Sequence, residues 1–230
     1  MLLYRRRAVA VALTLVAAVS GCSDLDETSS GLSRNDLVGD LATQMTAAAE
    51  LTYEATYQLS GGGKATIAQA QKPSRSAYVY PGGRVTVTAD ATTECREVAK
   101  VTTCTMTAPA TLTSPPPAKV FAEADATGMV TPATVLTLLN SAVLDNNLEV
   151  KQHDTTIAGR HATCVELGGV DEAAASNFTT CITNEGILGS FSGVLNQTRV
   201  DVAMTHYAEQ VPDEMFDPPA AAKLIDHRGN

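Results

Sequence analysis

Hydrophobic and polar positions alternate along two long stretches of this chain, and a two-residue period predicts β-strands. Short turns rich in Gly, Pro, Asn and Asp separate neighbouring stretches, and connections this short join only antiparallel neighbours. The pattern therefore predicts two antiparallel sets of strands. The expected strands are 53–59, 64–71, 75–80, 84–89, a pair around Cys95 and Cys104, then 148–157, 161–167, 177–183, 187–192 and 199–207.

A period of three to four residues predicts two helices. Apolar residues recur in this way after Ser33-Arg34-Asn35-Asp36, a sequence typical of a helix start. A second helix should begin at Thr131-Pro132 and carry a broad apolar face. Pro115-Pro116-Pro117 offers no backbone donors and predicts a loop between the two sets of strands. Strands and helices together predict an α+β fold, a curved antiparallel sheet covered by the two helices.

The first residues of the chain read as an export signal. Arg5-Arg6-Arg7 precedes an apolar run that is too short to span a membrane, and the run ends at Val19-Ser20-Gly21-Cys22. Small residues before a cysteine are typical of a bacterial lipobox, so we expect a signal peptide at 1–21 and a lipid on Cys22; the alternative is an ordinary signal peptide with an incidental cysteine. A flexible tether over 22–32 and a single domain over 33–230 complete the predicted organisation.

The net charge of the chain bears on which kind of molecule it can bind. The chain has 16 basic and 25 acidic residues, a formal net charge of −9. Loss of the signal segment removes three Arg and no acid, which leaves 13 basic against 25 acidic residues and a net charge of −12. Phosphate backbones would repel such a surface, so nucleic acid is excluded as a partner. Acyl chains on Cys22 would then attach the protein to the extracytoplasmic face of the cell membrane.

Four cysteines remain beside Cys22. Outside the cytoplasm an even number of thiols favours disulfides, and sequence order favours Cys95 with Cys104 and Cys164 with Cys181 over the two other pairings. The alternative is a zinc site, but the spacings lack the CxxC pattern of such sites. We therefore expect two disulfides and no metal.

Motifs for catalysis are incomplete. Gly189-Ser190-Phe191-Ser192-Gly193 has Phe where a nucleophile elbow needs Ser, and the stretch is predicted to be a strand. The acidic pairs Asp171-Glu172 and Asp213-Glu214 should diverge on loops. The histidines lack the helical spacing of a zinc enzyme. No catalytic residue, metal ligand or cofactor is predicted, and the chain is not expected to be an enzyme. The four histidines are His153, His161, His206 and His227.

A sheet faced with small apolar side chains could enclose a cavity for an amphiphile instead of a filled core. The alternative is that Ala, Val and Thr reflect codon usage alone, and composition cannot decide because it does not report packing density. The residues expected to line the cavity lie on the first strand, the second helix and the last strand: Tyr53, Tyr57, Leu59, Val135, Leu136, Leu139, Val143, Val200, Val202 and Met204.

The order of these elements resembles the lipoprotein carriers of the LolA and LolB type and, among lipidated members, the LprG and LppX type of mycobacterial lipoproteins. Tyr53-Glu54-Ala55-Thr56-Tyr57 on the first strand and the closing segment from Tyr207 to Pro219 carry the resemblance. It implies an eleven-strand half-barrel lidded by helices around an apolar cavity.

Two functions follow from this resemblance. The leading hypothesis is a non-enzymatic, membrane-anchored envelope lipoprotein that binds or carries a lipid or another amphiphile. The alternative is a regulatory lipoprotein that senses lipid or binds a membrane protein partner. A carrier should copurify with lipid, whereas a regulator should have a filled core and an exposed partner surface.

Overall fold

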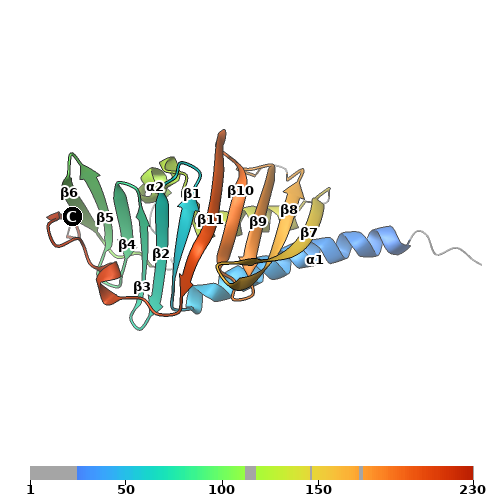
Figure 1. The fold of residues 1–230 in the computed structure, drawn as a ribbon, viewed down its shortest axis with the longest axis horizontal. Coiled ribbons are helices and arrows are strands. Elements are labelled where there is room, and N and C mark those ends of the chain that lie inside the picture. Colours follow the sequence, from blue (N-terminus) through green and yellow to red (C-terminus); the bar gives the residue numbers. More distant parts are fainter. Residues whose placement is uncertain (1–24, 112–117, 146, 171–172, 230) are drawn as a thin grey trace, which may run out of the picture.

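The computed structural model describes residues 25–111, 118–145, 147–170 and 173–229, and these build one open sheet (Figure 1). The strand order is β12-β6-β5-β4-β3-β2-β1-β11-β10-β9-β8-β7, and every neighbouring pair is antiparallel except β12 with β6. The first strand, β1, lies at the centre of the sheet, and β2 to β6 follow in order toward one edge. β7 forms the opposite edge, and β8 to β11 follow in order back to the centre, where β11 pairs with β1. The strands are β1 (Tyr53–Leu59), β2 (Lys64–Gln71), β3 (Ser74–Tyr80), β4 (Gly83–Val87), β5 (Thr92–Val98), β6 (Val101–Thr107), β7 (Glu149–Ile157), β8 (Arg160–Gly168), β9 (Asn177–Thr183), β10 (Leu188–Leu195), β11 (Thr198–Ala208) and β12 (Lys223–Asp226).

The predicted α+β class and both antiparallel sets are confirmed, but the strand number is not. All eleven expected strands are present, and β12 is a twelfth that the pattern analysis missed. Its four residues, Lys223–Asp226, show no sustained alternation, and β12 joins the sheet by parallel backbone pairing with β6. A strand this short leaves no periodic signal in the sequence.

The helices lie on one side of the sheet, here called the helix face; the opposite side is called the open face (Figure 1). The helices α1 and α3 pack against each other. Thr131 caps α3 as predicted, because its hydroxyl oxygen accepts a hydrogen bond from the Thr134 N–H at 3.2 Å. The helical segments are α1 (Leu25–Ala47), α2 (Ala122–Ala126), α3 (Pro132–Val143), and the 3-10 turns η1 (Ala48–Glu50), η2 (Ala118–Phe121) and η3 (Asp213–Phe216).

The predicted start of the first helix at Ser33 is wrong. The helix begins at Leu25, so much of the segment expected to be a tether has a helical backbone. Gly31 is the residue of this segment with the lowest helix propensity, at a cost of about 1 kcal/mol, and a longer helix tolerates that cost. That 22–32 acts as a tether stays a prediction.

Alternation determines which side chains form the core. In β1 the residues Tyr53, Ala55, Tyr57 and Leu59 are buried, and the residues between them are only half-buried. The buried set faces α1 and α3 within one hydrophobic cluster. The period of two seen in the sequence therefore corresponds to the core and surface of the sheet.

The C-terminal segment covers part of the open face. Phe216 of η3 packs on Ala68, Ala70 and Ala77 of β2 and β3. The guanidinium of Arg75 lies 4.4 Å from the centre of the Phe216 ring and forms an ion pair with Asp213. The chain then continues to β12 at the edge beside β6, so this half of the sheet is covered on both faces (Figure 1).

The structure contains both predicted disulfides. Cys95 lies opposite Cys104 across β5 and β6, and Cys164 lies opposite Cys181 across β8 and β9. Val165, the neighbour of Cys164, belongs to the main core, whereas Cys164 and Cys181 form a separate cluster with Ala162. Because neighbouring side chains on a strand point to opposite faces, this disulfide lies on the open face.

Candidate functional site

The residues expected to line a cavity meet between the sheet and the helices, although they come from three distant segments. Eight are between 0% and 4% exposed, and Leu136 and Val143 are partly buried against the same cluster. β1 and β11 are paired side by side at the centre of the sheet, and α3 lies across the helix face. That these side chains line a cavity stays a prediction. The eight are Tyr53, Tyr57, Leu59, Val135, Leu139, Val200, Val202 and Met204.

The tyrosines of β1 are the polar members of this apolar layer. The Tyr57 hydroxyl donates a hydrogen bond to the Leu188 carbonyl oxygen at 2.9 Å. Tyr53 stacks with Tyr207 of β11, with ring centres 6.3 Å apart. Burial raises the pKa of Tyr57 well above its ordinary value, because a phenolate would lose its hydration there. This part of the interior therefore holds neutral tyrosines.

The other end of the interior, between α2 and strands β3 to β5, is more polar. The hydroxyls of Tyr80 and Thr92 are buried, and neither has a hydrogen-bond partner within the described residues. Thr92 lies opposite Val87 at the far end of β4, whereas Tyr80 lies opposite Gly83 at its start, on the level of Arg96. Close by, Arg96 donates to Glu123 of α2 at 2.6 Å and to Glu94 at 3.1 Å. Burial, followed by the Glu123 and Glu94 carboxylates, raises the pKa of Tyr80 to about 12. A buried hydroxyl without a partner costs about 1 to 3 kcal/mol, so this end can accept a hydrogen bond from, or donate one to, a ligand.

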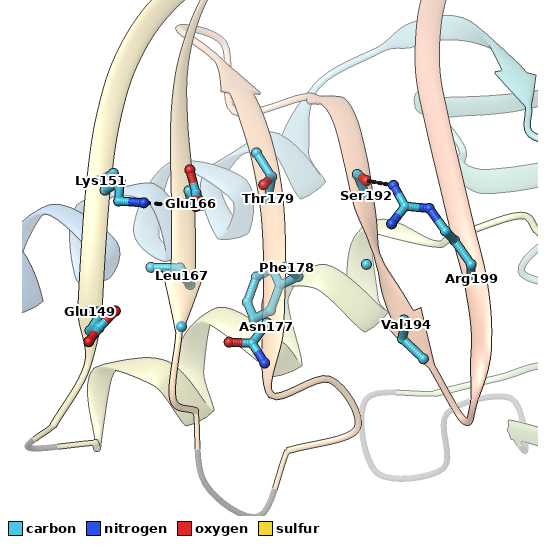
Figure 2. A pocket seen from close by; sticks show the side chains of 12 residues that line it. Glu149, Lys151, Glu166, Leu167, Asn177, Phe178, Thr179, Ser192, Val194 and Arg199 are labelled. Carbon is cyan, nitrogen blue, oxygen red and sulfur yellow. Dashed lines mark hydrogen bonds and ion pairs between the residues drawn. The ribbon is translucent and has the colours of Figure 1, made fainter.

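A second candidate site is a groove of about 430 Å³ on the open face of strands β7 to β11, shown in Figure 2. Its walls are polar side chains that alternate with the buried residues of the same strands. Lys151 forms an ion pair with Glu166 at 3.1 Å. Arg199 donates to the Ser192 hydroxyl oxygen at 3.2 Å and to Asp201. Sequence reasoning missed this groove because it followed only the buried positions of each strand.

Comparison with known proteins finds distant similarities of fold. No protein-family model matches the chain, and neither does any curated protein. The MucA/MucB complex of Pseudomonas aeruginosa is similar to it at 10% identity and a TM-score of 0.49, covering 82% of this chain and 63% of that chain. The chain thus spans less than two thirds of the MucB chain.

Two further structures match over nearly their whole length. An uncharacterized conserved protein from Thermus thermophilus matches at 7% identity and a TM-score of 0.47, covering 82% of this chain and 98% of that chain. The Mycobacterium tuberculosis lipoprotein LppX matches at 13% identity and a TM-score of 0.42, covering 77% and 98%. These are distant similarities of fold, without support from sequence.

The incomplete motif at 189–193 lies on a strand, as expected. Phe191 belongs to the core and stacks on Phe178, with ring centres 5.7 Å apart, while Ser192 lines the open-face groove. Within the described residues no three His, Cys, Asp or Glu side chains are grouped so that they could hold a metal ion.

The predicted signal peptide at 1–21 and the predicted lipidation site Cys22 lie outside the described residues. Among the helices that are described, none is long and apolar enough to cross a membrane. The two disulfides are typical of proteins outside the reducing cytoplasm.

Proposed function

We propose that this protein is a membrane-anchored lipoprotein of the cell envelope that binds an amphiphile, without catalysis, between its sheet and its helices. The lipobox ending at Cys22 supports the anchor, and the disulfides support an extracytoplasmic location. The observation that carries the ligand class is the interior itself: its apolar layer includes Tyr80, whose buried hydroxyl has no hydrogen-bond partner within the described residues.

An amphiphile fits this combination better than a purely apolar ligand. Its chain would lie among the side chains of β1, α3 and β11, which are already shielded from water. Its polar group would hydrogen-bond to the Tyr80 hydroxyl and so offset the cost of burying that hydroxyl without a partner. Nothing in this arrangement requires a cofactor or metal.

Native mass spectrometry of the mature chain carrying Cys22→Ala tests the ligand. We expect the protein with an unsubstituted interior to copurify with lipid. Leu139→Trp narrows the interior, so this variant should lose the lipid, at a cost of about 1 to 3 kcal/mol in the free energy of unfolding. Val194→Trp, at a residue 48% exposed, is the matched control and should retain the lipid. If the unsubstituted interior carries no lipid and Leu139→Trp unfolds the domain, the core is filled and the carrier proposal fails.

The anchor has its own test. Cys22→Ala should move the protein from the membrane fraction to the soluble envelope fraction, or leave it unprocessed, because two acyl chains provide stable attachment. Unchanged, processed membrane association would contradict the lipid anchor.

A regulatory or interaction role is the second candidate, and one observation favours it. Eight of the ten expected lining residues are at most 4% exposed and contact one another, as in a filled core. In that case lipid would be absent from the purified protein, and the open face and the β7 edge would provide the surface for a membrane protein partner.

A further inference from the structure

The strand β7 forms one edge of the sheet and is unusually complete for an edge. Its pairing with β8 runs without interruption from Glu149, opposite Gly168, to Ile157, opposite Arg160. It contains no proline and no bulge, and all but its two partly buried residues, Val150 and Ile157, are exposed. No other strand of the described chain pairs with its outer side (Figure 1).

The position of the disulfide shows which backbone groups of β7 are free. Opposite residues of antiparallel strands alternate between wide pairs that exchange hydrogen bonds, about 5.5 Å between Cα atoms, and close pairs that do not, about 4.5 Å. The Cα atoms of Cys164 and Cys181 are 3.9 Å apart, so these residues form a close pair. The backbone N–H and C=O of Cys164 therefore point away from β9, toward His153 of β7.

Alternation extends this assignment along the strand. Because His153 bonds to β8, so do the odd-numbered residues on either side of it, and the residues between them point their N–H and C=O groups outward. These outward groups form a continuous template on which another extended chain can pair. The residues with free backbone groups are Val150, Gln152, Asp154 and Thr156.

Edges of this kind are ordinarily protected by short strands, prolines, bulges or charged side chains. β7 has none of the first three, and its one lysine, Lys151, is held by Glu166 on the open face. The hairpin that carries β7 is also fixed at its tip, where Arg160 forms ion pairs with Glu185 and, at 3.6 Å, with Glu209. The edge is thus presented in an ordered conformation, which lowers the entropic cost of binding.

The charges beside the edge indicate the chemistry of the partner. Glu149 and Asp154 are exposed and have no cationic partner among the ion pairs of the described residues, whereas Lys151 is already paired. The whole chain carries a net charge of −9. Glu149 lies on the open face with Lys151, whereas Asp154 lies on the helix face, where its carboxylate accepts a hydrogen bond from the Thr163 hydroxyl at 3.0 Å. A segment that adds to this edge would therefore place a Lys or Arg side chain on each of its faces, one beside each carboxylate.

We propose that β7 is a docking edge on which an extended, basic segment of another protein adds as a thirteenth strand. The free backbone groups provide the pairing, and Glu149 and Asp154 select positively charged side chains. The site is independent of any ligand in the interior.

Amide hydrogen exchange measured by NMR tests the assignment of free groups. In the protein alone, the amides of Gln152 and Asp154 should exchange quickly and those of Lys151 and His153 slowly. Addition of a short peptide of Val and Lys, with lysines on both faces of the extended chain, should slow the first pair. The proposal fails if all four are already protected while the protein sediments as a dimer, because a second copy would then occupy the edge.

Binding of the same labelled peptide, measured by fluorescence anisotropy, tests the surface. Gln152→Pro removes only an outward N–H and should leave the fold intact while weakening binding at least about tenfold. His153→Pro, which removes an N–H bonded to β8, should instead destabilise the fold. The double variant Glu149→Gln, Asp154→Asn should weaken binding about three- to tenfold and reduce its salt dependence.

Two peptide controls complete the experiment. A peptide of the same length with prolines in place of alternate valines cannot pair as a strand, and a Val and Glu peptide has the wrong charge; neither should bind. Equal binding of either control, or binding of the basic peptide that Gln152→Pro and the carboxylate variant both leave unchanged, would overturn the proposal.

Discussion

The two halves of the sheet differ in how their faces and edges are covered. In the half from β2 to β6, η2 and α2 lie on the helix face, the C-terminal segment lies on the open face, and the edge is β12, a strand of only four residues. In the half from β7 to β11, α1 and α3 cover the helix face, while the open face forms a polar groove and β7 ends the sheet. The chain therefore covers one half with its own C-terminal segment and leaves the backbone edge of the other half available to a partner.

The largest effect is expected where the less covered half meets α1. Gly186, in the turn between β9 and β10, has φ +84°, and a Cβ there would lie 2.1 Å from the Gln44 carbonyl oxygen. Gly186→Ala must displace backbone as well as adopt a strained φ, so we expect a loss of about 3 kcal/mol or more in urea unfolding.

Gly159 provides the matched control. It also has a positive φ, +79°, but nothing lies within 4 Å of its ideal Cβ. Gly159→Ala should cost only the conformational strain, about 1 kcal/mol. Equal losses for the two variants would mean that the turn does not press on α1.

Phe216→Ala tests the cover over the other half. Phe216 is 4% exposed, packs on three alanines and stacks with the Arg75 guanidinium. Removal of the ring should cost about 3 kcal/mol and increase hydrogen exchange in β2 and β3. The control is Leu224→Ala on β12, where the side chain is 54% exposed and the loss should stay within about 0.5 kcal/mol. Unchanged exchange in β2 and β3 on loss of the ring would show that the C-terminal segment does not protect them.

The same comparison explains what the sequence could predict. Alternation over 53–59 identified β1 and its buried face, because a half-buried strand imposes a period of two. Thr131-Pro132 located the start of α3 for an equally local reason. Spacing and compartment together identified the cysteine pairs that the structure joins.

Features that depend on distant contacts left no such trace. The contact of Gly186 with Gln44 joins a turn to a helix far along the chain, and only its glycine is visible in the sequence. Which strand would be an edge depends on the order of the whole sheet, so β7 was not distinguishable from β8. The free hydroxyls of Tyr80 and Thr92 likewise follow from tertiary burial, because both residues sit on ordinary alternating strands.

Alkaline pH should affect the interior of both halves. The pKa of Tyr80 is raised to about 12, and that of Tyr57 is raised by burial. A phenol whose folded pKa exceeds its unfolded value of about 10 contributes stability below pH 10 and loses it as the pH rises toward 12. We therefore expect stability to fall above about pH 10, with tyrosinate absorbance appearing together with unfolding.

Tyr80→Phe and Tyr57→Phe test the contribution of each buried phenol to this titration. Tyr80→Phe should flatten the pH dependence of the free energy of unfolding between about pH 10 and 12, because the shifted phenol in the polar end is removed. Tyr57→Phe should flatten the same window at least as much, because the Tyr57 phenol ionises near pH 10 in the unfolded chain while burial keeps it neutral in the folded protein. Tyrosinate absorbance that develops fully while the protein remains folded would contradict the burial of these hydroxyls.

The smallest expected effect on stability lies at the β7 edge, at the ion pair of Lys151 with Glu166. Their side chains are 76% and 56% exposed, so solvent screens the pair and Lys151→Ala should change the free energy of unfolding by less than about 0.5 kcal/mol. The effect of Lys151→Ala on peptide binding should be larger than its effect on stability. Loss of Lys151 frees the Glu166 carboxylate beside Glu149 and increases the negative charge along the edge, so a basic peptide should bind about two- to threefold more tightly. Weaker binding would mean that Lys151 itself contacts the partner, and that the edge selects an acidic segment.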